Sequence, residues 1–131
     1  MSAEGIVPPD VVRSLASSPG LKLLVLYGSR ARGDARNDSD WDFAYEADPG
    51  FDADGLLARL AERLHADRID LADLERTGAL HRHRVARDGV VLIEREPGRF
   101  ERFRLQAIQT WCDLAPVLTS LYEDALEVLP Q

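Results

Sequence analysis

The stretch LKLLVLYGSRARGDARNDSDWDF, residues 21–43, joins an apolar run, a glycine–serine pair and two closely spaced aspartates. Its first part, residues 21–27, is aliphatic or aromatic apart from one lysine, and this pattern predicts a buried strand. Gly28 and Ser29 follow directly, and such a pair can form a tight turn that presents backbone N–H groups to an anion. The stretch therefore predicts a strand that ends in a phosphate-binding turn.

Two aspartates, Asp40 and Asp42, open a second predicted strand over about 40–45. Because alternate residues of a strand share a face, their carboxylates point the same way, about 6.5 Å apart along the chain, while Trp41 and Phe43 point into a core. Aspartate is depleted in strands, so a pair on one face indicates a functional site. The alternative is that the two aspartates merely begin a strand next to a turn. Next to a phosphate-binding turn, paired carboxylates indicate metal–nucleotide chemistry.

Hydrophobic periodicity and turn residues divide the rest of the chain into alternating helices and strands. They predict helices over about 11–17, 29–31, a dozen residues through 56–64, and 73–85, a short strand over 68–71 and a buried strand over 90–93. This alternation predicts an α/β fold with one main sheet. We expect a single domain over 1–131, with a core over about 21–95 and C-terminal helices over about 99–129.

The C-terminal segment carries apolar side chains at three- and four-residue steps, which predicts an amphipathic helix. Asp113 and Pro116 predict a kink or a break near 112–115, because aspartate can cap a second helix and proline fits its first turn. We expect the apolar stripe to cover the protein's own sheet over most of its length, with a docking face for a partner as the alternative. Cys112 is predicted to be a small core residue.

The composition excludes several classes of protein. The 131 residues suit one domain, and Asp and Glu (23) outnumber Lys and Arg (16), for a net charge of −7. This acidity argues against nucleic acid as the main partner and is compatible with a divalent metal and with a basic protein or a cationic small molecule as the second partner. No apolar run approaches the roughly 20 residues of a membrane span, no signal peptide is evident, and a lone cysteine predicts a reducing, cytoplasmic location.

A third carboxylate, Asp70, lies between apolar residues of the predicted strand 68–71. An unpaired carboxylate there would be costly, so Asp70 is the best partner for Asp40 and Asp42. Three such oxygen ligands suit Mg²⁺, and two ions about 3.5–4 Å apart can flank a phosphoryl group during its transfer. The histidines of the run 81–83 have no further soft ligands nearby, and we predict that they lie on a solvated helix face.

These residues together resemble a known family. Gly28-Ser29, a spacing of ten residues, then Asp40 and Asp42, and later Asp70, match the signature of the DNA polymerase β-like nucleotidyltransferase superfamily. The small chain and the form GSRARG…SDWDF are most similar to the minimal nucleotidyltransferases, the antitoxin members encoded beside HEPN-domain toxins. The resemblance covers about 21–93 and implies a small mixed sheet flanked by helices, with a helical C-terminal segment.

The resemblance also implies roles for individual residues. Asp40 and Asp42 would bind both of two magnesium ions, and Asp70 would bind one ion and help to activate the incoming hydroxyl. Arg30 and Arg32 are candidate phosphate contacts, with a pair to a nearby aspartate of the turn as the alternative for either arginine.

The turn before these arginines has an implied role as well. Gly28 and Ser29 would hold the triphosphate of ATP, the co-substrate.

The function implied by the resemblance is transfer of AMP from ATP to a tyrosine hydroxyl of a cognate HEPN RNase toxin, which neutralises the toxin. A hetero-oligomer with the toxin would follow from that role. One alternative is nucleotidyl transfer to a small molecule such as an aminoglycoside, although the chain leaves little room for an acceptor domain. The other is an antitoxin that acts by binding alone, which three intact aspartates argue against.

Overall fold

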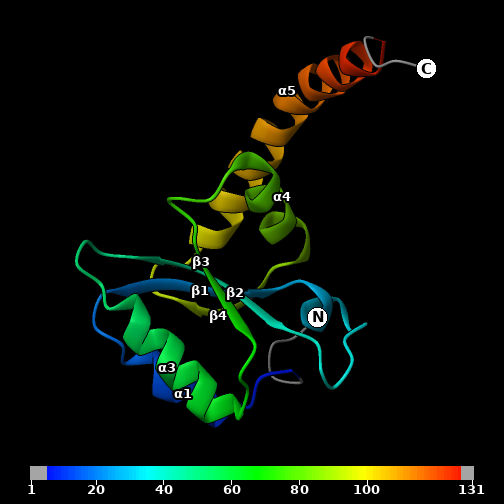
Figure 1. The fold of residues 1–131 in the computed structure, drawn as a ribbon. Helices are drawn as coiled ribbons and strands as arrows, with labels where there is room; N and C mark the ends of the chain where they lie inside the picture. The colour runs from blue at the N-terminus through cyan, green and yellow to red at the C-terminus, as the bar shows by residue number, and fades with distance from the viewer. Residues whose placement is uncertain (1–5, 128–131) are drawn as a thin grey trace.

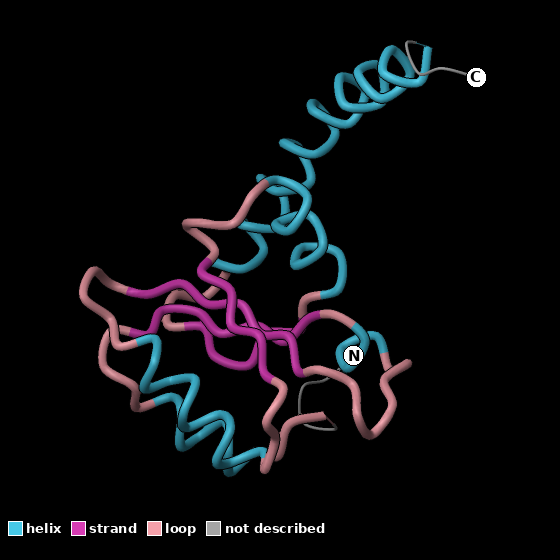
Figure 2. Tube along the Cα trace, in the orientation of Figure 1, coloured by secondary structure: helices cyan, strands magenta, loops and turns pink. Residues whose placement is uncertain are grey.

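The computed structural model describes residues 6–127 and contains one mixed, four-stranded sheet (Figure 1). The strands are β1 Leu21–Tyr27, β2 Trp41–Ala47, β3 Ile69–Asp73 and β4 Val90–Glu94. They lie in the order β3-β2-β1-β4. β1 is antiparallel to both of its neighbours, whereas β2 and β3 run parallel. Figure 2 shows the strands together, with helices on both sides of them. The small mixed sheet that the sequence predicts is confirmed.

Helices cover both faces of this sheet. Within residues 6–127 they are α1 Pro9–Ala16, α2 Ser29–Arg32, α3 Ala53–Leu64, α4 Ala79–Asp88 and α5 Arg99–Glu127. Figure 1 shows α1 and α3 below the sheet, and α4 and the start of α5 above it. The buried apolar residues accordingly form two clusters, one on each face.

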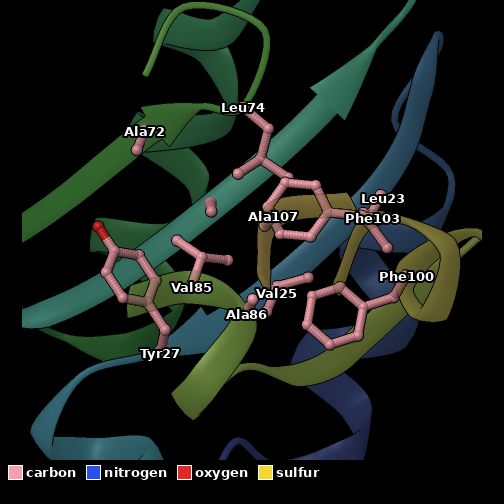
Figure 3. Close-up of a cluster of buried hydrophobic side chains, with 11 residues drawn as sticks. Leu23, Val25, Tyr27, Ala72, Leu74, Val85, Ala86, Phe100, Phe103 and Ala107 are labelled. Atoms are coloured by element: carbon pink, nitrogen blue, oxygen red, sulfur yellow. The ribbon is translucent and has the colours of Figure 1, made fainter. Parts of the chain in front are cut away.

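The central strand β1 supplies side chains to both clusters. Leu24 and Leu26 pack with Phe43 on the side of α1 and α3, whereas Leu23 and Val25 point to the side of α4 and α5 (Figure 3). All five side chains are fully buried. Because helices lie on both faces, every position of this strand is best occupied by an apolar residue, and this explains the unbroken apolar run in the sequence.

Two elements differ from the prediction. The helix expected over 73–85 begins only at Ala79, because the Asp73 carboxylate accepts a hydrogen bond from the Glu75 amide at 2.9 Å and closes a turn there. The strand expected to be buried, β4, lies at the edge of the sheet, and all of its residues are half-buried. An edge strand has a neighbour on one side only, so its apolar composition does not ensure full burial.

Two acidic side chains hold the start of α5 against the sheet. Glu94, at the end of β4, accepts hydrogen bonds from the amides of Gly98 (3.2 Å) and Phe100 (2.9 Å). Buried Glu46 of β2 accepts two hydrogen bonds from the Arg99 guanidinium, one of them at 2.7 Å. A carboxylate at a helix N-terminus is favourable, and a two-point arginine pair fixes orientation. These contacts determine where α5 leaves the body of the protein.

The helix α5 is continuous from Arg99 to Glu127, so a break near 112–115 does not occur, and the alternative, a kink there, stays a prediction. Asp113 does not cap a second helix; its Oδ1 accepts a hydrogen bond from Gln109 Nε2, one turn earlier, at 3.0 Å. Pro116 lies inside the helix, and helical spacing places it opposite the buried face, where water can bind the carbonyl that proline leaves free. The last two residues of the segment predicted to be helical, 128–129, lie outside the described residues.

Only the first part of α5 covers the sheet. Its buried residues are Phe100, Phe103 and Ala107, so the prediction that the apolar stripe covers the sheet over most of its length is wrong. Cys112 is exposed and is therefore not a core residue, contrary to the prediction. Among the described residues, none of the helices is both long and apolar enough to cross a membrane.

Candidate active site

The turn after β1 brings the backbone directly against a carboxylate. Gly28 has φ of +77°, which L residues rarely adopt, and a Cβ atom at this position would overlap the carboxylate of Asp42. α2 runs from Ser29 to Arg32 and is capped by Gly33, whose φ is +87°. Glycine at position 28 is therefore required twice, by the backbone conformation and by the space that Asp42 occupies.

Asp42 and Asp70 face each other across neighbouring strands. They are register partners in the parallel pair of β2 and β3. Burial raises the pKa of Asp42, and the negative charges of Asp70 and Asp40 raise it further. This mutual repulsion is what a bound cation would relieve, since a positive charge nearby favours the ionised carboxylates.

Asp40 lies just before β2 and is exposed. It lines a shallow hollow together with Asp70, which also lines the cleft that contains Asp42. Asp70 thus lines a hollow with each of the other two carboxylates. Among residues 6–127, no three His, Cys, Asp or Glu side chains converge closely enough to form a ready metal cage. The donor set suits Mg²⁺, which takes one or two carboxylates and completes its shell with water and substrate phosphate oxygens.

The cleft that Asp42 and Asp70 line has a volume of about 380 Å³. Its walls come from β1, α2, β2, β3 and α4, and the lining residues are Tyr27, Gly28, Ser29, Arg32, Asp42, Asp70, His81, Arg84, Arg87 and Asp88. Carboxylates of β2 and β3 form one part of the lining, and basic side chains of α4 and α2 form another. A lining with both negatively and positively charged side chains fits a ligand that combines a divalent cation with a polyphosphate.

A larger groove of about 980 Å³ adjoins this cleft and runs beside β4. The two share Arg32, Arg87 and Asp88, but Asp42 and Asp70 do not line the larger groove. The paired carboxylates therefore locate the chemistry in the smaller cleft.

His81 lines the cleft, so the prediction that it lies on a solvated helix face is wrong. Its Nε2 is 2.5 Å from the hydroxyl oxygen of Tyr27, the last residue of β1. Burial, followed by the charges of Asp70 and Asp42, raises the pKa of the Tyr27 phenol, which therefore keeps its proton at neutral pH. His83 is also not solvated; it is half-buried and stacks on Trp111 with ring centroids 5.2 Å apart.

The two arginines of the turn have different surroundings. Arg32 lines the cleft and pairs with Asp88 at 2.8 Å and with Asp34 at 3.3 Å. Arg30 lies outside the cleft lining, donates to the carbonyl of Ser39 at 2.8 Å and stacks over the Trp41 ring at 4.1 Å. The structure therefore brings Arg32, but not Arg30, to the carboxylates.

Arg87 and Arg84 of α4 were not predicted from the sequence. Arg87 makes a two-point pair with Asp88, and hydrogen bonds from Arg87 and Arg32 hold the pKa of Asp88 below its usual range. Arg84 is exposed at the cleft and forms no ion pair with any described residue. The HRHR pattern carried no recognisable motif, and only the path of the chain brings α4 over the end of β1.

Comparison with known proteins identifies the family. The family model "Polymerase beta, Nucleotidyltransferase" matches residues 10–98. The chain belongs to this nucleotidyltransferase family. A curated relative, the protein adenylyltransferase MntA of Aphanizomenon flos-aquae (strain 2012/KM1/D3), is 36% identical over 110 residues, which cover 74% of this chain and 73% of that protein. The resemblance inferred from the spaced glycine, serine and aspartates is confirmed.

Solved nucleotidyltransferase structures share the whole fold. A toxin–antitoxin crystal structure with AMP-PNP superposes with a TM-score of 0.75 at 25% identity, covering 92% of this chain and 99% of that chain. An MNT antitoxin complex with a tri-AMPylated HEPN toxin of Shewanella oneidensis has a TM-score of 0.64 at 24% identity, with coverage of 89% and 91%, and supports the fold alone. The polymerase β-like fold predicted from the sequence is confirmed.

Proposed function

We propose that this nucleotidyltransferase moves AMP from ATP to a tyrosine hydroxyl of a HEPN RNase toxin and so neutralises that toxin in the cytoplasm. The observation that carries the proposal is the pairing of Asp42 with Asp70 beside the Gly28–Ser29 turn, in a cleft that basic side chains of α4 also line. Two relatives support the choice of acceptor: one is named a protein adenylyltransferase, and another is a toxin–antitoxin structure with AMP-PNP.

Six residues in or beside the cleft have a role in this reaction. Gly28 and Ser29 hold the triphosphate through the backbone N–H groups of their turn, and Arg32 contacts it with a guanidinium. Asp40 and Asp42 would hold two magnesium ions, and Asp70 would hold one of them. When bound, the ions would neutralise phosphate charge and polarise the α-phosphate.

The transfer itself is an in-line displacement at the α-phosphorus. The acceptor oxygen forms a bond to this phosphorus while the bond from the phosphorus to the bridging oxygen breaks, and pyrophosphate leaves. Asp70 accepts the proton of the attacking hydroxyl. The protein supplies position and charge and needs no covalent nucleophile of its own.

Labelled ATP tests this function. The protein is incubated with magnesium and α-³²P-ATP, with or without the product of the adjacent gene, and the partner is examined for label. We expect label on the toxin from α-labelled ATP but not from γ-labelled ATP, and none with the Asp40→Asn variant. Label on an aminoglycoside instead would indicate a small-molecule acceptor. Full neutralisation by a variant carrying both Asp40→Asn and Asp42→Asn would establish an antitoxin that acts by binding alone.

Arg84 forms no ion pair with any described residue, and we therefore expect its guanidinium to contact the nucleotide. Replacing Arg84 by Gln is expected to raise the KM for ATP about tenfold with a smaller change in kcat, because a charge-assisted contact to the triphosphate is lost. Initial rates of transfer at varied ATP concentrations measure this effect. Arg63→Gln is the control, since Arg63 is exposed on α3, across the sheet from the cleft. Equal KM values for the two variants would remove Arg84 from the nucleotide site.

A further inference from the structure

Half of α5 extends beyond the body of the protein. The helix has 29 residues and is therefore about 43 Å long at 1.5 Å per residue. Its last buried residue is Ala107, and one turn later Trp111 stacks on His83 of α4. Beyond Trp111 the helix projects away from the sheet and from the other helices (Figure 1).

This projecting half continues the same apolar face that packs against the sheet. Leu114, Leu118 and Leu121 follow Phe103 and Ala107 at helical spacing and so lie on the same side of the helix. Together with Val117 and Tyr122 they form what we call the distal stripe: Leu114, Val117, Leu118, Leu121 and Tyr122. Its members are between 39% and 66% exposed. A helix that only met solvent would be polar all round, so a stripe of this kind indicates a partner.

The charges beside the distal stripe indicate what kind of partner fits. Residues 105–127 contain Asp113, Glu123, Asp124 and Glu127 but no Lys, Arg or His. Helical spacing places Asp113 and Asp124 along the same flank of the stripe. A second copy would bring like charges together, and an anionic membrane would be repelled. A partner surface that is apolar with a basic rim is complementary to the distal stripe and its acidic flank. A toxin that binds RNA carries basic surface of this kind.

The position of the distal stripe relates it to the cleft. α5 packs on α4 through the His83–Trp111 stack and through a hydrogen bond from Arg104 Nε to the carbonyl of Ala86 at 3.0 Å. α4 also carries His81 and Arg84 into the cleft. A protein held by the distal stripe would therefore lie on the side of the sheet that α4 covers.

We propose that the distal stripe of α5 is the docking surface for the acceptor toxin, a protein with an apolar patch and a basic rim. This inference rests on the proposed function for the identity of the partner. The stripe holds the toxin while the cleft modifies it, so docking and chemistry reside in separate residues. Loss of the stripe should weaken binding of the toxin and raise its KM, but leave kcat and the binding of ATP unchanged.

Two charge-matched double variants test this surface in the full-length chain. Leu118→Glu with Leu121→Glu places two charges in the distal stripe, whereas Thr119→Glu with Ser120→Glu places two charges on exposed positions outside it. Calorimetry with purified toxin gives the Kd, and label transfer gives KM and kcat. We expect the first variant to bind the toxin at least about tenfold more weakly, and the second to bind like the unmodified protein. Circular dichroism and binding of a fluorescent ATP analogue should be unchanged in both.

The outcomes separate docking from catalysis. Equal toxin affinity for the unmodified protein and the stripe variant overturns the docking proposal even if label still reaches the toxin. Equal weakening by both variants also overturns it, because added charge rather than the stripe would then be the cause. Sedimentation that shows dimers lost only in the stripe variant, with toxin binding unchanged, would assign the stripe to a second copy. Stripe-dependent toxin binding without any label would support docking and reject AMP transfer.

Discussion

Replacing Asp42 by Asn is expected to lower the rate of AMP transfer by about three orders of magnitude, equivalent to about 4 kcal/mol of transition-state stabilisation. The change removes one negative charge and keeps the shape of the side chain. Asp42 is the carboxylate that faces both Asp70 across the sheet and Gly28 in the turn. Steady-state label transfer at saturating ATP and toxin measures the effect.

Stability should respond in the opposite direction. Burial and two neighbouring carboxylates disfavour the charged form of Asp42, so Asp42→Asn is expected to keep or raise the melting temperature at neutral pH without magnesium. Asp52→Asn is the matched control, because Asp52 caps α3 by accepting from the Gly55 amide at 2.9 Å, and asparagine caps as well as aspartate. A melting temperature that falls only in Asp42→Asn would show that the carboxylate is structural.

Replacing Gly28 by Ala is expected to reduce both activity and stability strongly. The new Cβ would meet positive-φ strain of about 1–2 kcal/mol and would also overlap the Asp42 carboxylate, which must move. Because displaced catalytic groups lose their alignment, we expect a loss of at least about 10²-fold in transfer rate. Urea denaturation and label transfer on the same preparation measure the two effects.

Gly50 provides a matched control for Gly28. It shares the positive φ of Gly28, with +82° against +77°, but a Cβ at Gly50 would have no atom within 4 Å. Gly50→Ala should therefore show the backbone strain alone and keep full activity. Similar activities for the two variants would mean that the close approach of Gly28 to Asp42 does not matter for the reaction.

Local patterns in the sequence predicted the core of the fold well. The apolar run at 21–27 and the paired aspartates after the turn both depend on residues close together in the chain. Their physical causes are equally local: strand periodicity and a glycine with positive φ. Most of the family signature is local as well, since only thirteen residues separate Gly28 from Asp42.

Other features depended on where distant segments meet. Tyr27 and His81 are 54 residues apart, and nothing in the run 81–83 indicates that one of its histidines lines the cleft. Arg30 and Arg32 look alike in sequence, yet one stacks on Trp41 and the other lines the cleft. Such differences arise from the direction in which each side chain leaves its element, which composition and spacing do not encode.

The stretch 21–43 by itself determined the central strand, the turn and the carboxylates of this nucleotidyltransferase. Only the tertiary structure decided which basic residues join the cleft and how far α5 is covered. The reason is physical: periodicity shows that one side of a helix is apolar but not what lies against it. In α5 the protein's own core covers that side as far as Ala107, and beyond it the same face is left open to solvent.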